Sequence, residues 1–176
     1  RAYGRIKDFE RAIDSEQPDA VLSYPIVLEM RSIPSKFRGE REGSADDTYI
    51  LVTLDQGFAL DSLDGKTIGV LDLLGRKRMP KLVSSIVGVP GKPRLKRVKR
   101  PEDLVSLLLL GMADSILVPA RQLGEIKKAS GANLIAIKLH GIGLALPSLG
   151  LLTQGDQSQV IAEGLKKIDS RTNLEM

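Results

Sequence analysis

Short, fully apolar strands that alternate with helices constrain the fold of this chain most. The strand Thr67-Ile68-Gly69-Val70-Leu71 follows a polar turn at Asp64-Gly65, and the strand 115–118 follows a helix that Gly111 ends. Strands that are apolar on both faces are typical of parallel sheets covered by helices. The pattern therefore predicts an α/β fold built from βαβ units, in which ligands bind at the carboxyl ends of the strands.

The expected elements follow from the hydrophobic periodicity and from the glycines and prolines that interrupt it. The expected helices are 3–15, 24–31, 80–87, 101–110, 120–129 and 157–168. The expected strands are 20–23, 48–54, 67–71, 115–118 and 134–139, with 94–98 as a weaker candidate and 34–47 as a loop.

Two breaks in this pattern predict two lobes. The passage 55–65 separates two strands, and Gly141, Gly143 and Pro147 interrupt the chain again near its end. A chain that leaves one lobe, builds a second and returns to the first would show both breaks. We expect a discontinuous lobe one and an inserted lobe two, each a mostly parallel sheet flanked by helices. Lobe one comprises 1–54 plus 144–176, lobe two comprises 66–140, and 55–65 and 141–143 are the crossover segments.

The composition narrows the classes of partner. The chain has 176 residues, a net charge of +4 and a pI near 9.4, which favours anionic ligands. Aromatic residues make up 3% of it and Trp is absent, so the stacking platforms that bind single-stranded nucleic acid are nearly missing and no nucleic acid is expected. No apolar run approaches the ~20 residues of a membrane span, so we expect no direct membrane insertion.

Five stretches together resemble a known family. They are Tyr3-Gly4 through Ile13, Pro18-Asp19-Ala20-Val21-Leu22-Ser23-Tyr24-Pro25, Leu63-Asp64-Gly65-Lys66-Thr67-Ile68-Gly69-Val70, Glu102-Asp103-Leu104, and Leu110-Gly111-Met112-Ala113-Asp114-Ser115-Ile116-Leu117. In order and spacing they are similar to the type 2 periplasmic binding protein fold, and within it to the branch that binds phosphate, phosphite and phosphonate. The family begins with a strand and a helix before the position of Tyr3, so the chain resembles a member that lacks its first segment.

The resemblance implies the solute-binding component of an ABC-type uptake system. Such a protein binds a small, phosphate-like or phosphonate-like anion between two lobes and passes it to a transporter permease. It is periplasmic or otherwise extracytoplasmic, and a lipoprotein signal upstream would anchor it to lipid. No cofactor is expected. The alternative is the ligand-sensing effector domain of a cytoplasmic transcriptional regulator with the same fold.

The candidate ligand-binding residues lie where strands end. Each has a structural alternative: Tyr24 could pack on the helix that it introduces, Ser23 could cap that helix, and the basic residues could be solvated surface. The candidates are Ser23, Tyr24, Gly75, Arg76, Lys77, Lys99, Pro119 and Arg121.

The residue types of the chain point away from catalysis, and one segment is strongly basic. His140 is the only histidine and there is no cysteine, so we expect neither a His-based metal cluster nor a thiol nucleophile, and we do not expect an enzyme. Segment 92–100 holds six lysines and arginines. It could contact nucleic acid or lipid phosphates, although we favour an exposed edge strand whose charges prevent aggregation.

Overall fold

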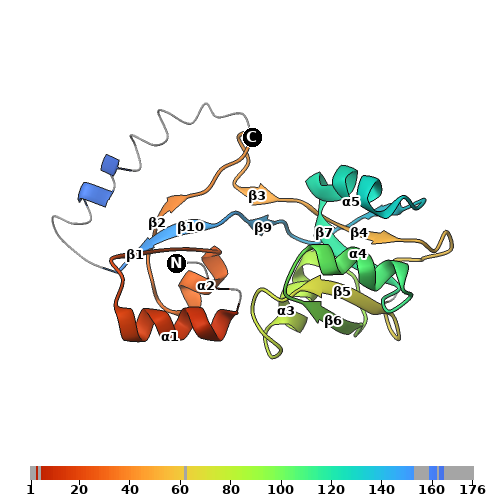
Figure 1. The fold of residues 1–176 in the computed structure, drawn as a ribbon, viewed down its shortest axis with the longest axis horizontal. Coiled ribbons are helices and arrows are strands. Elements are labelled where there is room, and N and C mark those ends of the chain that lie inside the picture. Colours follow the sequence, from red (N-terminus) through yellow and green to blue (C-terminus); the bar gives the residue numbers. More distant parts are fainter. Residues whose placement is uncertain (1–2, 4, 62, 153–158, 162, 165–176) are drawn as a thin grey trace. The chain divides into compact units, whose positions relative to one another are not determined.

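A computed structural model of the chain describes residues 3, 5–61, 63–152, 159–161 and 163–164 (Figure 1). The chain divides into two compact units. Unit 1 comprises Arg1–Glu10 and Asp46–Leu144, and unit 2 comprises Arg11–Ala45 and Ala145–Met176. Most of the helix expected over 157–168 lies outside the described residues. None of the helices in the described ranges is both long and apolar enough to cross a bilayer.

Unit 1 is built on a five-stranded sheet with the strand order β6-β5-β7-β4-β8. The strands are β4 (Tyr49–Thr53), β5 (Thr67–Leu71), β6 (Arg94–Val98), β7 (Ser115–Pro119) and β8 (Ile135–Lys138). Strand β5 pairs in parallel with β6 and β7, whereas β4 pairs in antiparallel with β7 and β8. The sheet is therefore mixed, and the expectation of a mostly parallel sheet holds only for its β6-β5-β7 half.

The helices of unit 1 are α3 (Met79–Val87), α4 (Glu102–Leu109) and α5 (Leu123–Ser130), with a 3₁₀ turn η1 (Ala120–Gln122) before α5. Gly88 ends α3 with a φ of 70°, a left-handed conformation that glycine adopts without a Cβ clash. Helix α4 carries Glu102 and Asp103 in its first turn, where negative charge interacts favourably with the helix dipole. The local signals in the sequence therefore place α3 and α4 within one residue at each end, whereas the helix expected over 120–129 begins as the 3₁₀ turn η1 and continues as α5.

The core of unit 1 lies on the face of the sheet that α4 and α5 cover. It brings together strand residues that alternate along β4 and β7 with one side of each helix. Its buried members are Ile50, Val52, Leu104, Leu108, Ile116, Val118, Ile126 and Leu134. None of the five buried residues of α3 belongs to this cluster. We therefore assign α3 to the opposite face, toward which the buried Leu51 and Ile68 point by alternation.

Unit 2 contains a smaller, wholly antiparallel sheet with the order β1-β10-β2. Its strands are β1 (Ala20–Ser23), β2 (Ser35–Arg38) and β10 (Ser148–Leu151), and its helices are α2 (Pro25–Met30) and the part of α1 (Ile6–Glu16) after residue 10. The expected parallel sheet is wrong for this unit, because a strand from the far end of the chain lies between β1 and β2. Strand β2 falls inside segment 34–47, which the sequence predicts to be a loop. Only one of its four side chains is half-buried, so the segment lacks the apolar pattern that predicts a strand.

The chain crosses between the units within α1, after Glu10, and again at residues 45/46 and 144/145. At the last two positions β3 (Asp46–Asp47) and β9 (Leu144–Ala145) form a two-stranded sheet. The crossing at 144/145 adjoins the expected crossover 141–143. The crossing at 45/46 differs from the expected crossover 55–65 and moves β4 from lobe one into unit 1. The physical reason is burial, since Leu51 and Val52 are fully buried and β4 lies between β7 and β8. The passage 55–65 is a long connection within unit 1.

Gly141 is packed directly against the backbone of α3. A Cβ at this position would overlap the carbonyl oxygen of Ile86, and the N–H of Ile142 donates a hydrogen bond to the carbonyl of Ser85 at 3.1 Å. By contrast, a Cβ at Gly124 in α5 would meet no atom within 4 Å. An added methyl group should therefore destabilise the folded protein at Gly141 but not at Gly124.

We predict that Gly141→Ala lowers the free energy of unfolding by about 2 kcal/mol, because backbone atoms must shift to admit the methyl group. Gly124→Ala is the matched control and should raise the free energy of unfolding by about 0.5 kcal/mol, because alanine is the better helix former. Urea denaturation of the two variants and the parent measures both changes. Equal stability of the two variants would contradict this packing.

Candidate functional site

The strongest candidate site in unit 1 lies at the carboxyl ends of β5 and β7. These adjacent parallel strands connect to helices on opposite faces of the sheet: β5 leads into α3, and β7 leads into α5. Such a change of direction is a topological switch point, where open α/β sheets bind ligands. The carboxyl end of β6 and the start of the antiparallel β4 lie at the same edge. We call this edge the strand-end edge.

Strands β5 and β7 are held together at their amino ends, and their pairing ends before this edge. The N–H of Asp114 donates to the carbonyl of Thr67 at 2.9 Å, and the N–H of Thr67 donates to Oδ2 of Asp114 at 2.6 Å. The residue pairing runs from Ile68 with Ser115 to Gly69 with Ile116 and stops there, although both strands continue. The backbone is thus unpaired between β5 and β7 where the switch point lies.

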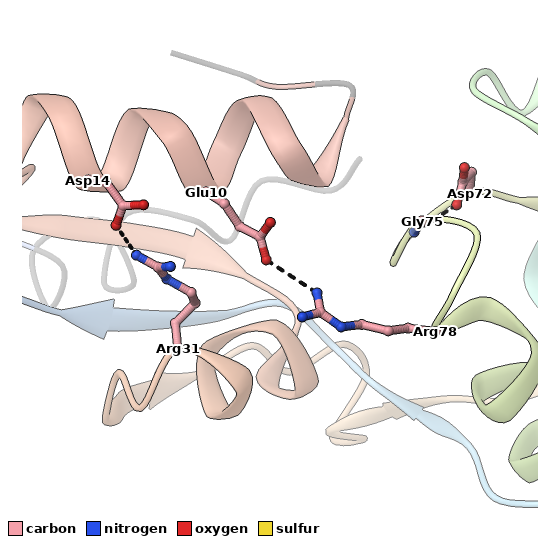
Figure 2. Close-up of polar contacts among 6 residues, drawn as sticks. All are labelled: Glu10, Asp14, Arg31, Asp72, Gly75 and Arg78. Carbon is pink, nitrogen blue, oxygen red and sulfur yellow. Dashed lines mark hydrogen bonds and ion pairs between the residues drawn. The ribbon is translucent and has the colours of Figure 1, made fainter.

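The loop after β5 is organised by the carboxylate of Asp72. Its Oδ1 accepts the N–H of Gly75 at 2.9 Å, as Figure 2 shows, and its Oδ2 pairs with Nη1 of Arg97 on β6 at 2.7 Å. The side chains of Asp72 and Arg97 are 23% and 30% exposed. The backbone N–H of Asp72 also donates to the carbonyl of Val98 at 2.8 Å, so this loop is fixed to the end of β6.

A second pair of opposite charges lies beyond β7. Nε of Arg121, in η1, is 3.2 Å from Oδ1 of Asp47, in β3. The aspartate side chain is 17% exposed and the arginine side chain is 46% exposed. The pair is near the strand-end edge because β7 ends at Pro119, which pairs with the first residue of β4. Both signs of charge are therefore present at the ends of β5 and β6 and again beyond the end of β7.

The basic residues before α3 are not equivalent. Arg76 and Lys77 are exposed in the turn that leads into the helix. Nη1 of Arg78 lies 3.2 Å from Oε1 of Glu10, as drawn in Figure 2, so this guanidinium already has an anionic partner. No side chain caps the amino end of α3, and no acidic residue lies in its first turn.

Ser23 and Tyr24 belong to unit 2. Ser23 ends β1 and pairs with Ser148 of β10, and Tyr24 is the N-cap residue of α2, with its carbonyl accepting the N–H groups of Val27 and Leu28. No side-chain hydrogen bond caps this helix, so the capping role considered for Ser23 is not what the structure shows. Both residues are half-buried.

Unit 2 also contains an ion pair that the sequence did not single out. Nη2 of Arg31, the C-cap residue of α2, contacts Oδ1 of Asp14 on α1 (Figure 2). The carboxylate is 63% exposed and the arginine 29% exposed. The pair joins the two helices of this unit.

The structure brings six of the eight predicted site residues into unit 1, at the ends of three neighbouring strands. They are Gly75, Arg76, Lys77, Lys99, Pro119 and Arg121. The sequence reasoning missed the charged partners Asp72, Arg97 and Asp47. Asp72 could have been found, since it directly follows a buried strand; the partner of Arg121 could not, since 74 residues separate it from Asp47.

Comparison with known proteins identifies the fold. No protein-family model matches the chain, and no curated protein sequence matches it. Solved structures do match. The substrate-binding protein of an amino acid ABC transporter has a TM-score of 0.63 and 19% identity, over 92% of this chain and 69% of that chain. The arginine-bound AbpA of Streptococcus pneumoniae has a TM-score of 0.59 and 10% identity, over 92% of this chain and 67% of that one.

A further neighbour is a domain of a larger protein. The periplasmic VFT2 domain of Bordetella pertussis BvgS has a TM-score of 0.51 and 15% identity, with 83% of this chain and 59% of that chain covered. These likenesses establish an α/β fold of the two-lobed periplasmic binding protein type. The chain spans about three fifths to seven tenths of the length of these neighbours.

We predict that Asp72→Ala lowers the free energy of unfolding by about 1–2 kcal/mol, because it removes charge-assisted hydrogen bonds to Gly75 and Arg97 in a partly buried loop. Asp61→Ala changes an exposed aspartate of the same unit and should leave the free energy of unfolding nearly unchanged. Urea denaturation compares the two variants with the parent. A loss as small for Asp72→Ala as for Asp61→Ala would show that the loop does not depend on this carboxylate.

Proposed function

We propose that the chain is the ligand-binding part of a solute-binding protein and that its ligand is a small zwitterion of the amino acid class. The observation that carries the proposal is the strand-end edge, where a switch point of the sheet lies between two partly exposed pairs of opposite charge. A ligand with both an ammonium and a carboxylate group requires both signs of charge near one another. Asp72 and Asp47 are the proposed partners of the ammonium group, and Arg97 and Arg121 those of the carboxylate.

The same geometry argues against a phosphate-like ligand at the loop after β5. A phosphate bound there would need the free N–H groups of the loop and of the start of the helix. The carboxylate of Asp72 already accepts the N–H of Gly75 and places a negative charge beside it. Arg78, one of the three cations before the helix, is paired with Glu10. The phosphate and phosphonate ligands expected from the sequence are therefore disfavoured.

Ligand exchange at this edge is energetically plausible. Ion pairs between partly exposed side chains contribute only about 0.2–1 kcal/mol, so a ligand group can replace one partner at little cost. Both aspartates are less exposed than their arginines, and an ammonium group that reaches them leaves bulk water. We propose that the site selects by charge pattern and does not transform its ligand.

The solved neighbours support the amino acid class. Their descriptions name amino acid ABC transporter substrate-binding proteins, an arginine-bound protein and an ancestral arginine-binding protein bound to glutamine. By analogy we propose an extracytoplasmic role in ABC-type uptake with a permease as the partner. No specific observation favours the alternative of a regulator's effector domain.

Calorimetric titration of the chain with the common amino acids, with inorganic phosphate and with methylphosphonate tests the ligand class. We expect at least one amino acid to bind, with basic or amide side chains as the first to try, and neither of the two anions to bind. Binding of phosphate or methylphosphonate in preference to every amino acid would reverse the assignment.

The strand-end edge is tested separately with conservative variants. Asp72→Asn should weaken the binding of the amino acid found above by about tenfold, because an amide cannot pair with an ammonium group as a carboxylate does. Asp61→Asn makes the same chemical change at an exposed position away from this edge and should bind like the parent. Thermal unfolding of both variants confirms that they are folded. Unchanged affinity in Asp72→Asn would place the ligand elsewhere.

A further inference from the structure

The positive charge of this chain is concentrated in one segment. Segment 92–100 holds six lysines and arginines and no acidic residue, and its charge of +6 exceeds the +4 of the whole chain. The rest of the chain therefore carries a net charge of −2. Such an asymmetry indicates an electrostatic surface and cannot be explained by general solubility, which a dispersed charge would provide.

The structure places this segment along an open side of unit 1. Strand β6, which contains most of the segment, is at one end of the five-stranded sheet and pairs with β5 alone among the described strands. All six basic residues are exposed, whereas the apolar Leu95 and Val98 between them are half-buried. Within β6, Arg94 and Lys96 lie on one face of the strand and Arg97 on the other, because side chains alternate along a strand. We call the six exposed basic residues of segment 92–100 the basic edge.

The arginines and lysines of the basic edge have different roles. Each of the three arginines is bound within the unit: Arg94 donates to the carbonyl of Gly65 at 3.2 Å, Arg97 pairs with Asp72, and Arg100 pairs with Asp103 at 2.9 Å. The hydrogen bond and the charge of Asp103 raise the pKa of Arg100. The side chains of the three lysines, by contrast, have no hydrogen bond or ion pair to any described residue. They are Lys92, Lys96 and Lys99.

We propose that the basic edge is a docking surface for the anionic headgroups of a phospholipid bilayer. The partner follows from charge complementarity, since clusters of four to eight basic residues bind anionic lipid surfaces with about 1 kcal/mol for each cation near the surface. The lysine side chains, which have no partner among the described residues, reach the headgroups, and the arginines are held within the unit. This inference goes beyond the proposed ligand binding and does not depend on it.

The basic edge has neither aromatic residues nor a helix, and this favours lipid over nucleic acid as the partner. No aromatic residue lies in segment 92–100, so bases would find no side chain on which to stack. The basic residues lie on an extended strand at a sheet edge and not on a helix that could enter the major groove. A lipid surface requires only a row of cations held at the surface of the protein.

Sedimentation of the chain with lipid vesicles tests the proposal. We expect binding to vesicles that contain one third phosphatidylglycerol, little binding to pure phosphatidylcholine, and loss of binding at high salt, because the Debye length falls from about 10 Å at 0.1 M to about 3 Å at 1 M. The double variant Lys92→Gln with Lys96→Gln should bind the anionic vesicles about tenfold or more weakly. It leaves Lys99, at the strand-end edge, unchanged.

The double variant Lys127→Gln with Lys128→Gln is the matched control. It removes the same charge from exposed lysines of the same unit on α5, and it should bind the vesicles like the parent. Equal weakening of both variants would show an effect of net charge alone and overturn the proposal. Absence of vesicle binding by the parent would overturn the proposal and leave the charges with the role of protecting the strand edge. Binding of duplex or single-stranded DNA without binding of vesicles would assign the basic edge to nucleic acid.

Discussion

Asp114 joins three strands of unit 1 at one point, and the geometry of the candidate site depends on it. Its carbonyl accepts the buried hydroxyl of Thr53 on β4 at 2.7 Å, while its N–H and its carboxylate bind Thr67 at the start of β5. The pairing between β5 and β7 begins beside Asp114 and ends at Gly69 and Ile116, before the strand-end edge.

The two edges of unit 1 use charge in different ways. At the strand-end edge, Arg97 and Arg121 are each paired with a partly buried carboxylate, so both signs of charge lie together there. At the basic edge, Arg97 and Arg100 have carboxylate partners, whereas the side chains of the three lysines have no hydrogen bond or ion pair to any described residue. Arg97 belongs to both, because it lies on β6 and pairs with Asp72 at the end of β5. The charge of Arg97 therefore contributes to both surfaces.

Local sequence signals predicted most elements but not the way in which strands pair. Strands 20–23, 67–71 and 94–98 agree residue for residue with β1, β5 and β6, because runs of apolar or β-branched residues bounded by turns are local features. The sequence could not show that β4 lies between β7 and β8 or that β10 lies between β1 and β2, because both depend on pairing between distant residues. The same limit explains why Arg121 was predicted without its partner Asp47.

The sequence by itself determined the fold class and the concentration of positive charge in segment 92–100, since each depends on residues close together in the chain. It also predicted a site at the strand ends. Only the tertiary structure decided the mixed and antiparallel sheets, the place of β4, and the pairing of Asp72 with Arg97 and of Asp47 with Arg121. The physical reason is that an ion pair or a strand pairing is set by distances in space. Those distances arise only when the whole core has packed.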